Sequence, residues 1–463
     1  MPSLIHLGFM QAVILAAGAG TRLEPLTLTM SKVMVPLANK PMLEWVVETA
    51  KAVADTVYIV VRRDQLDVID YFKSKPGIRF IYQDKPLGTG HALLQAKNII
   101  AASEAGGDAS GVMSAEGASN SSEITSLREA QASDTSKITA QQGMADAAID
   151  DATGGAAASN SANATNTDFL LMNGDILTTP DNVKALAALP SPAIAGFEMP
   201  NPQDFGVLTI RGEGADCRVI ELTEKPSKPA SKMINAGIYK LNASIFPILE
   251  NLQKTERDEY ELTDALSQLL PMACHTLSVW AHLTHPWDIL EANRFVLDTW
   301  GPQLGKAEVR PGAYIEQPVA IGEGAILGPN CYIRAYSSIG AGCKVGNAVE
   351  IKNSIIMQNS FVSHLSYVGD SIVGRDCNIA AGTIFANLRL DGKTVKMQIK
   401  GKVIDTGRRK LGALVGDGVH FGVHCTVMPG RRIWPGILIP PCTIIKNDVT
   451  KQHSLKSWKR ILT

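Results

Sequence analysis

Residues 11–41 read QAVILAAGAGTRLEPLTLTMSKVMVPLANKP, and this stretch decides the fold of the first half of the chain. Residues 12–17 are apolar and end at glycines, as is typical of a parallel strand buried on both faces. In the turn that follows, Gly18 and Gly20 have no Cβ atom to keep an anion away from the backbone N–H groups. Arg22 and Lys32 can supply positive charge beside that turn. The stretch therefore predicts a phosphate-binding turn after a buried strand.

The spacing excludes two common phosphate-binding motifs. The third glycine of a dinucleotide fingerprint would stand at position 23, which is leucine, and no Gly-Lys-Ser/Thr follows as in an NTPase loop. The pattern LAAGAGTRL, then PLT, Ser31-Lys32 and Lys40-Pro41, resembles the signature of the sugar-1-phosphate nucleotidylyltransferases, with Ser31 where many members have proline. The resemblance implies nucleotide contacts for Leu15, Ala17, Gly18, Gly20 and Thr21, and catalytic roles for Arg22 and Lys32.

Composition narrows the class of protein. A chain of 463 residues is long for one core, so two or three domains are expected. A net charge of -1 and a pI near 6.8 give no reason to expect nucleic acid or an anionic membrane as a partner. Seven cysteines without a CxxC pair fit neither a disulfide framework nor a zinc site. No leader pattern and no apolar run of about 18 residues is present. We expect a soluble, cytoplasmic protein.

Strand and helix patterns alternate after the glycine-rich turn. Apolar residues recur at helical spacing over residues 41–53, and residues 57–61 form a β-branched and aromatic run. A further strand is expected at residues 80–82 and a further helix at residues 91–99. The alternation predicts an α/β domain over residues 10–300, with a Rossmann-like, mostly parallel, doubly wound sheet. Ligands of such a sheet bind at the carboxyl ends of its strands.

The alternation is interrupted over residues 102–166, where Ala, Ser, Gly, Asn and Asp dominate. The segment has no aromatic residue, proline or cysteine, so it cannot bury enough apolar surface to offset its ordering entropy. We predict a disordered insert with a brief helix around residues 122–131. We favour an ordinary surface loop for this insert over an arm that binds a partner.

Two aspartates are candidates for holding Mg²⁺. Asp175 follows the apolar strand at residues 168–172, which places its carboxylate at the ligand-binding edge of the sheet. Asp288 stands among apolar residues just before an expected helix at residues 290–300. By resemblance, both match the aspartate pair that holds the metal in the nucleotidylyltransferases. The alternative role for Asp288 is an N-cap of the helix.

Further segments match the family residue by residue. Gln83, Gly88 and Thr89 stand in a pattern resembling the segment that contacts the pyrimidine base, which implies UTP or dTTP as the nucleotide. Gly206, Glu224 and Asn235 lie in three segments that resemble those holding the sugar phosphate. The implied reaction is an in-line attack of a sugar 1-phosphate on the α-phosphate, releasing pyrophosphate, with catalysis by positioning and charge neutralisation.

The second half of the chain is a repeat. Aliphatic or aromatic residues recur about every six positions, at Ile321, Leu327, Ile333, Ile339, Val345, Ile351, Ile356, Val362, Val368, Val373, Ile379, Val415, Phe421, Val427, Ile433, Ile439 and Ile445. This hexapeptide period predicts a left-handed parallel β-helix over residues 301–463, with these side chains inside. Cys331, Cys343, Cys377 and Cys425 each stand four residues after a repeat position, so we expect them to be packing residues.

One turn of the repeat carries chemistry. His364 stands two residues after a repeat position, and residues 388–412, here called the excursion, leave the β-helix and are rich in lysine and arginine. A basic loop beside a histidine suits an anionic acyl carrier and an amine that must lose a proton. A surface histidine in a structural β-helix is the alternative.

These residues resemble the acetyltransferase half of the bifunctional N-acetylglucosamine-1-phosphate uridyltransferase/glucosamine-1-phosphate acetyltransferases, which reads HLTYxGD and then NIGAGT. The resemblance implies that His364 is the general base and Asn387 its companion for the acyl group. Arg334, Lys352, Tyr367 and Asn378 would hold the hexosamine 1-phosphate, and Ala381, Lys393 and Val423 would contact acetyl-CoA. Ala380 replaces a glycine, and the excursion is similar to that of the archaeal branch, in which the choice of amino sugar is broader.

Three interpretations follow. The first is a two-site enzyme that acetylates glucosamine 1-phosphate and then transfers a uridylyl group, giving UDP-N-acetylglucosamine. The second is a single-activity glucose-1-phosphate uridylyl- or thymidylyltransferase with a structural β-helix, and the third a regulatory assembly subunit. By resemblance, flat β-helix faces pack side by side, so we expect a homotrimer whose acetyl site is shared between chains.

Overall fold

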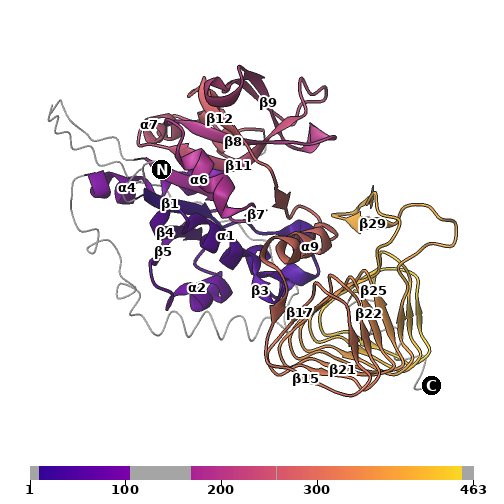
Figure 1. Ribbon diagram of the computed structural model, residues 1–463. Coiled ribbons are helices and arrows are strands. Elements are labelled where there is room, and N and C mark those ends of the chain that lie inside the picture. Colours follow the sequence, from indigo (N-terminus) through magenta and orange to yellow (C-terminus); the bar gives the residue numbers. More distant parts are fainter. Residues whose placement is uncertain (1–9, 105–167, 257, 451–463) are drawn as a thin grey trace, which may run out of the picture.

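The computed structural model describes residues 10–104, 168–256 and 258–450, and it contains an α/β domain joined to a three-sided β-helix (Figure 1). Both predicted architectures are confirmed. The insert expected at residues 102–166, together with its brief helix, lies outside the described residues from position 105 onwards. The α/β domain ends with a helix that lies at the junction of the two domains in Figure 1.

The α/β domain is built on one nine-stranded sheet. In spatial order its strands are β5 (Ile78–Tyr82), β4 (Ala54–Val61), β1 (Met10–Leu15), β6 (Phe169–Asn173), β11 (Met233–Leu241), β8 (Ala193–Glu198), β12 (Met272–Thr276), β10 (Arg218–Glu224) and β9 (Gly206–Arg211). The strand predicted in residues 12–17 is β1, at the centre of the parallel half, with β4 on one side and β6 on the other. Its carboxyl end therefore meets that of β6, which carries the Asn-Gly-Asp turn.

The second half of the sheet departs from the parallel pattern. Strand β11 runs antiparallel to both β6 and β8, and β10 runs antiparallel to β12 and β9. The connection between β9 and β10 spans only residues 212–217, and so short a connection can join only antiparallel neighbours. The alternation of strand and helix patterns stops before this hairpin, and for that reason it did not reveal the two reversed strands.

Helices cover both faces of the sheet. They are α1 (Met42–Ala50), α2 (Leu66–Phe72), α3 (Thr89–Leu94), α4 (Lys97–Glu104), α6 (Pro180–Ala187), α7 (Ile245–Glu250), α8 (Leu262–Ser267) and α9 (Asp288–Trp300). Apolar residues of α1, α6 and α9 share one core, and those of α3, α7 and α8 share another. The single helix expected at residues 91–99 is two helices, α3 and α4.

The β-helix has three faces, each a seven-stranded parallel sheet. The first face contains β14 (Gln303–Leu304), β17 (Ala320–Ile321), β20 (Ser338–Ile339), β23 (Ile355–Ile356), β26 (Ile372–Val373), β31 (Leu414–Val415) and β34 (Arg432–Ile433). The second contains β15 (Glu308–Val309), β18 (Ile326–Leu327), β21 (Lys344–Asn347), β24 (Phe361–His364), β27 (Asn378–Ile379), β32 (His420–Phe421) and β35 (Leu438–Ile439). The third contains β16 (Tyr314–Ile315), β19 (Tyr332–Ile333), β22 (Glu350–Lys352), β25 (Tyr367–Gly369), β28 (Ile384–Phe385), β33 (Thr426–Val427) and β36 (Ile444–Ile445).

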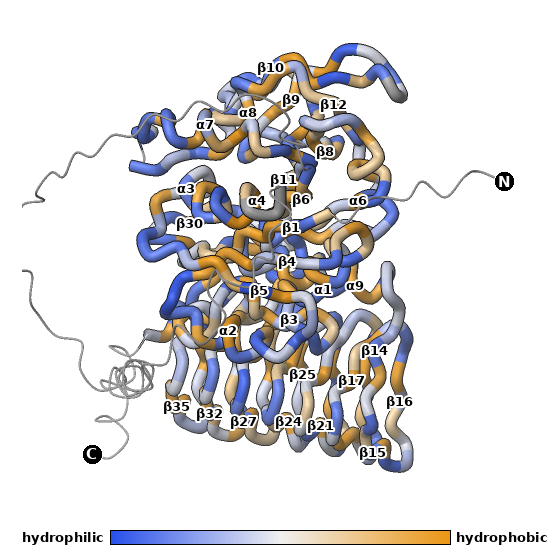
Figure 2. The backbone as a smooth tube through the Cα atoms, turned by 90° about the vertical axis from the view of Figure 1, so that its left-hand side faces the viewer, coloured by the Kyte–Doolittle hydropathy of each residue, from blue (hydrophilic) through white to orange (hydrophobic). Residues whose placement is uncertain are grey.

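The hexapeptide positions point inward, as predicted. All of the repeat residues from Ile321 to Ile445 are buried in one continuous core, and the four repeat cysteines are buried among them. In Figure 2 the successive coils lie side by side and hydrophobic and hydrophilic residues alternate along them. The first coil begins at β14, one coil before the pattern becomes visible, because Leu304 and Val309 lie at the exposed end of the stack. Between β28 and β31 the excursion forms a hairpin of β29 (Lys396–Ile399) and β30 (Lys402–Asp405).

The first face of the β-helix packs on the α/β domain. Ile355, Met357, Ile372 and Leu414 belong to the same buried cluster as α1 and α9. The segment after the glycine-rich turn also rests on this face, since Arg375 donates to the Thr29 carbonyl at 2.9 Å. The nucleotide turn is therefore braced by the other domain.

Asn293 of α9 joins the two domains. Its side chain is 1% exposed; its Oδ1 accepts from the Ala38 N–H at 2.8 Å and from the Ser338 hydroxyl at 2.7 Å, and its Nδ2 donates to the Tyr336 carbonyl at 3.0 Å. These three partners come from the segment after the nucleotide turn and from the β-helix.

We expect Asn293→Ala to destabilise the protein, at a cost of about 1–3 kcal/mol for each buried group left without a partner. The measurement is the urea unfolding midpoint. Asn251→Ala is the matched control, because Asn251 makes a single exposed hydrogen bond to the Pro247 carbonyl. Equal midpoints for the two variants would contradict the role of Asn293.

Candidate functional site

The glycine-rich turn is held in shape by its neighbours. Gly20 has a φ of 66°, and a Cβ atom there would lie 2.6 Å from the Cβ of Lys32, so only glycine fits. The Thr27 hydroxyl donates to the Gly20 carbonyl at 3.0 Å. Around Gly18, by contrast, no atom lies within 4 Å of a Cβ position, which leaves the backbone open to a ligand. Arg22, on the short 3-10 helix Thr21–Leu23, is exposed beside this opening.

Lys32 and Asp175 form an ion pair. The Lys32 Nζ lies 2.5 Å from the Asp175 Oδ2, and both side chains are largely shielded from water. Burial alone would raise the pKa of Asp175, but the Lys32 ammonium and the field of His282 lower it below its ordinary value. The carboxylate at the end of β6 is therefore ionised and faces a positive charge. The structure brings together two residues that lie 143 positions apart in the sequence.

Asp288 is the first residue of α9. Its Oδ2 accepts from the backbone N–H groups of Thr284 at 2.9 Å and of His285 at 2.7 Å. The N-cap position belongs to Trp287, so Asp288 ties down the loop before the helix and does not cap the helix itself. Among the described residues no hydrogen bond is made by its Oδ1, which leaves that oxygen for a ligand.

Two histidines that the sequence analysis missed lie beside Asp288. His282 Nε2 lies 4.0 Å and His285 Nδ1 3.9 Å from the Asp288 Oδ2. Burial lowers the pKa of both rings, although the negative charge of Asp288 opposes it. Asp175 acts on His282 as well, which places that ring within the field of both aspartates. Burial therefore favours the neutral form of both rings.

A strand pairing brings the segment of His282 close to Asp175. Strand β13 (Ala281–His282) pairs antiparallel with β7 (Ile176–Leu177), directly after Asp175, and the Leu283 N–H donates to the Asp175 carbonyl at 3.2 Å. The pairing brings the segment that leads to Asp288 beside the backbone of Asp175. Among the described residues no group of three or more Asp, Glu, His or Cys is arranged to hold a metal ion.

The predicted base-contact residues lie in one loop after β5. Gln83 is buried; its Nε2 donates to the Gly88 carbonyl at 3.1 Å and lies 3.0 Å from Nδ1 of His91. The Thr89 hydroxyl accepts from the Leu262 N–H at 3.2 Å. Gly88 has a φ of 103°, and a Cβ there would lie 2.6 Å from the Tyr260 carbonyl oxygen. The loop is thus shaped by contacts with the segment before α8.

The sugar-phosphate residues predicted in the α/β domain, Gly206, Glu224 and Asn235, lie close together. A Cβ atom on Gly206 would lie 3.1 Å from the Glu224 Oε2 and 3.5 Å from the Asn235 Cβ, so β9, β10 and β11 bring the three together. Phe205 and His282 contact each other edge to face, with ring centroids 5.0 Å apart. His282 therefore links the sugar side of the site to the aspartates.

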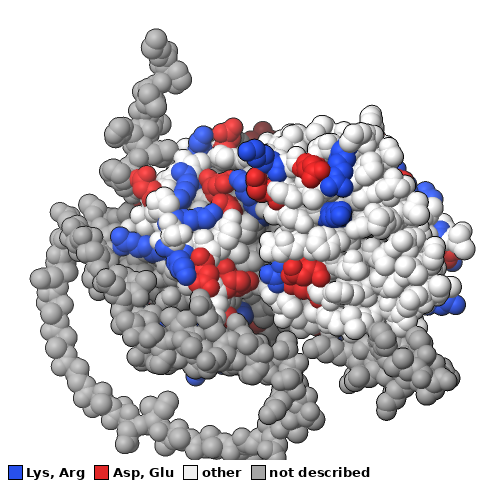
Figure 3. Space-filling view, turned by 90° about the horizontal axis from the view of Figure 1, so that it is seen from below, with Lys and Arg blue, Asp and Glu red and all other residues white. Residues whose placement is uncertain are grey.

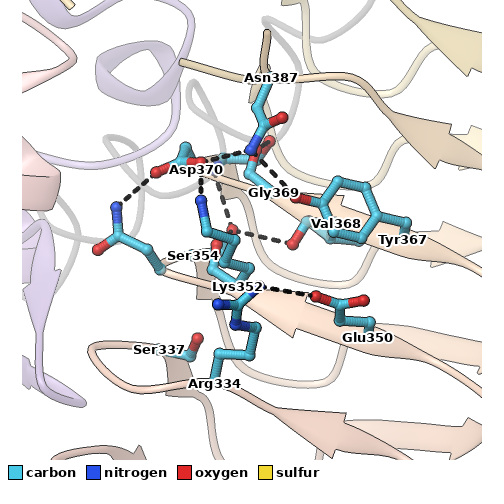
Figure 4. Close-up of polar contacts among 12 residues, drawn as sticks. Arg334, Ser337, Glu350, Lys352, Ser354, Tyr367, Val368, Gly369, Asp370 and Asn387 are labelled. Carbon is cyan, nitrogen blue, oxygen red and sulfur yellow. Dashed lines mark hydrogen bonds and ion pairs between the residues drawn. The ribbon is translucent and has the colours of Figure 1, made fainter. Parts of the chain in front are cut away.

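A second cluster lies on the third face of the β-helix, where its strands end (Figure 4). Asp370 is its centre: Lys352 Nζ lies 3.1 Å from the Asp370 Oδ2, and Asn387 donates to the same oxygen at 2.5 Å. Asn387 also donates to the Tyr367 hydroxyl at 3.0 Å. Arg334 pairs with Glu350 at 3.2 Å. Asp370 stood in the quoted motif, but its 5% exposure and its role as the common acceptor emerge only in the structure.

A pocket of about 510 Å³ opens beside this cluster. Its positive residues are Arg294, Arg334, Lys352, Arg408, Arg409 and Lys410. Its acidic residues are Glu291, Glu316 and Asp370. The predicted sugar-phosphate residues Arg334 and Lys352 thus line a cavity of ligand size.

The predicted acetyl-group residues lie elsewhere on the β-helix. His364 is exposed at the corner between β24 and β25, and its carbonyl accepts from the Gly382 N–H at 3.3 Å. Ala381 and Val423 occupy the same corner in the next two coils, since the His424 N–H bonds to Ala381 and the Cys442 N–H to Val423. Lys393 stands on the excursion, which leaves from the opposite edge of the third face, and Asn378 lies on the second face. Asn378 therefore lies on the strand next to that of His364, because β27 pairs with β24 and places Asn378 beside Phe361.

Comparisons with known proteins define the family. Residues 11–141 and 118–299 match the family described as nucleotidyl transferase, and residues 306–407 match the one described as GMPPB C-terminal domain. A protein from Methanocaldococcus jannaschii named bifunctional protein GlmU is 35% identical over 95% of this chain and 96% of its own length. The chain belongs to the GlmU family. A second GlmU-like relative, from Sulfurisphaera tokodaii, is named bifunctional sugar-1-phosphate nucleotidylyltransferase/acetyltransferase and is 34% identical over 95% of this chain and 98% of its own length.

Membership of the GlmU family confirms the prediction of a bifunctional transferase. A glucose-1-phosphate thymidylyltransferase from Streptomyces griseus is also similar, at 25% identity over 73% of this chain and 84% of its own length. The interpretation as a single-activity enzyme therefore has less support than GlmU-like bifunctionality. In the part of the chain that the structure describes, no helix is long and apolar enough to cross a membrane.

Proposed function

We propose that this GlmU-family chain makes UDP-N-acetylglucosamine in two steps. Acetyl-CoA first acetylates the amine of glucosamine 1-phosphate on the β-helix, and the α/β domain then transfers a uridylyl group from UTP to the product, releasing pyrophosphate. The observation that carries the proposal is the placement of His364 and of the cation-lined pocket at the two ends of one strand, β25. That strand has three residues and spans roughly 10 Å.

In the α/β domain, catalysis of the proposed reaction would rest on positive groups that neutralise the charge of the phosphates. Arg22 and the backbone N–H groups at Gly18 would receive the phosphates of the nucleotide, while Lys32 stabilises negative charge near Asp175. Carboxylate oxygens are the ligands that Mg²⁺ prefers, and Asp175 already accepts a cation, the Lys32 ammonium. The aspartate pair thus fits Mg²⁺, which would neutralise phosphate charge when bound. Glu224 and Asn235 would hold the sugar.

On the β-helix, His364 would accept the proton of the amine. Its ring is exposed at a corner, so a ligand that lies along β25 reaches it directly. Lys352 and Arg334 would hold the phosphate of the amino sugar at the other end of the strand, and Tyr367 would lie beneath the ring. Asn387 is positioned by Asp370 and Tyr367, to which its amide donates, and it would contact the acyl group.

The proposed acetyl site is shared between chains. The α/β domain covers the first face, whereas the second and third faces carry exposed apolar residues, Phe361 and Leu438 on one and Ile384 and Ile444 on the other. Figure 3 views the second face, and a broad part of its β-helix surface carries no charged side chain. A neighbouring chain could bring its Lys393, which stands on the excursion, to the corner of His364.

We therefore expect a homotrimer in solution. Analytical ultracentrifugation at micromolar concentration should give three times the mass of the chain. Phe361→Lys, which places a charge on the second face, should lower that mass and acetyl transfer together, while uridylyl transfer continues. A monomeric wild-type protein that still acetylates its substrate would contradict the shared site.

Product analysis tests the proposed function. Purified protein with Mg²⁺ is offered UTP or dTTP, with and without acetyl-CoA, against the 1-phosphates of glucosamine, galactosamine, glucose and N-acetylglucosamine. We expect acetyl-CoA-dependent product from glucosamine 1-phosphate and a UDP-sugar from N-acetylglucosamine 1-phosphate. Nucleotidyl transfer without acetylation of any hexosamine 1-phosphate would favour the single-activity alternative.

A further inference from the structure

The pocket beside Asp370 is lined by more lysine and arginine side chains than aspartate and glutamate side chains. Lys352 pairs with Asp370, Arg334 with Glu350, and Arg408 with Glu291. Among the described residues, Arg294, Arg409 and Lys410 have no ion-pair partner. Unpaired cations that line one pocket repel each other unless an anion lies between them.

These three cations do not belong to the β-helix coils. Arg294 comes from α9 of the α/β domain, and Arg409 and Lys410 come from the excursion just before it rejoins the first face. The excursion is clamped to α9, because Arg408 Nη1 lies 2.7 Å from the Glu291 Oε1. Figure 1 shows α9 and the β29 hairpin side by side at the junction of the domains.

The position of Arg294 is set by the β-helix. Its guanidinium carbon lies 4.0 Å from the ring centroid of Tyr336, a stacking contact that leaves the N–H groups at the edge free to donate. Arg408 adds a further donor, since its buried Nε has no hydrogen-bond partner among the described residues. The pocket therefore offers several planar N–H groups from two different parts of the chain.

We propose that Arg294, Arg409 and Lys410 form the outer half of a seat for the phosphate monoester of the acetyl-accepting sugar. The inner half is Arg334 and Lys352. The inference rests on the proposed acetyl transfer and assigns part of its substrate site to the nucleotidyltransferase domain. Arginine forks suit the oxygens of a phosphate dianion, because two N–H groups of one guanidinium can donate to two oxygens. The acetyl site thus includes residues of α9 and of the excursion.

Binding of glucosamine 1-phosphate, measured by calorimetry on the full chain without acetyl-CoA, tests the seat. Arg294→Ala and Arg409→Ala should each weaken binding roughly 10-fold, the usual effect of losing a hydrogen bond to a charged group. Arg294→Lys should retain part of the affinity. Arg310→Ala is the matched control, an exposed arginine that pairs with Glu308 outside the pocket. Uridylyl transfer reports correct folding of each variant and should not change.

Kinetics distinguish the two phosphate-bearing substrates that the cations could bind, glucosamine 1-phosphate and acetyl-CoA. We expect both alanine variants to raise the KM for glucosamine 1-phosphate and to leave the KM for acetyl-CoA unchanged. A raised KM for acetyl-CoA that vanishes with dephospho-acetyl-CoA would assign the cations to the coenzyme and overturn the proposal. Binding equal to that of Arg310→Ala, in a protein that acetylates normally, would also overturn it while leaving the proposed function intact. A wild-type chain that neither binds nor acetylates glucosamine 1-phosphate would overturn both.

Discussion

Replacing His364 by alanine should lower acetyl transfer by roughly 10²- to 10⁴-fold, the usual range for a lost general base. The amine of an amino sugar is largely protonated at neutral pH, and it must lose a proton before it attacks a thioester. His364 is exposed at the corner shared with Ala381 and Val423, and among the described residues its ring has no hydrogen-bond partner. His364 is the last residue of β24, and the next histidine at this corner is His424, which packs against Gly382. Uridylyl transfer should be nearly unchanged.

His364→Asn sharpens this test. Asparagine keeps a polar side chain at the corner but cannot accept the proton, so acetyl transfer should fall as far as with alanine. The loss should appear in kcat, with the KM for glucosamine 1-phosphate little changed, because the phosphate is held at the far end of β25. Normal acetylation by either variant would refute the assigned base.

Replacing Asp175 by asparagine should lower uridylyl transfer by roughly 10²- to 10³-fold, as expected for the loss of one preorganised charge at the reacting phosphates. The change removes the charge that faces Lys32 and that would hold Mg²⁺. Acetyl transfer should continue, because its residues lie on the β-helix. Chelation of Mg²⁺ by EDTA should separate the two activities in the same way.

Asp168→Asn is the matched control for Asp175→Asn. Asp168 directly precedes β6 and pairs with Lys240 at 3.0 Å, so it offers the same kind of ion pair at the opposite end of the same strand. If both variants lost uridylyl transfer equally, the effect would be structural. If Asp175→Asn kept full Mg²⁺-dependent transfer, the assignment of Asp175 would be wrong.

Local sequence patterns were sufficient to predict a residue's place in the structure wherever that place depends on neighbours in the chain. The glycine-rich turn needs Gly20 because of its own φ and the adjacent Lys32, and the six-residue period places Ile321 to Ile445 inside the β-helix because each coil repeats the last. The same holds for the buried cysteines. Asp175 could be placed at a strand end because a buried apolar run stops just before it.

Other features depended on contacts between distant segments, which no local pattern encodes. His282 reaches the aspartates only because β13 pairs with β7, and β11 reverses the sheet direction between two parallel strands. Asp370 becomes the common acceptor of Lys352 and Asn387 because successive coils stack their corners.

The sequence by itself therefore determined two domains, their architectures and the residues that match the family motifs. Only the tertiary structure decided how the domains meet, because Asn293 and Arg294 act through partners about 40 residues or more away in the chain. It also showed that Asn378 lies on the strand next to that of His364, because β27 pairs with β24. The physical reason is that spacing along the chain sets the conformation of a turn or a coil, whereas a pocket between domains is set by whichever surfaces bury apolar area against each other.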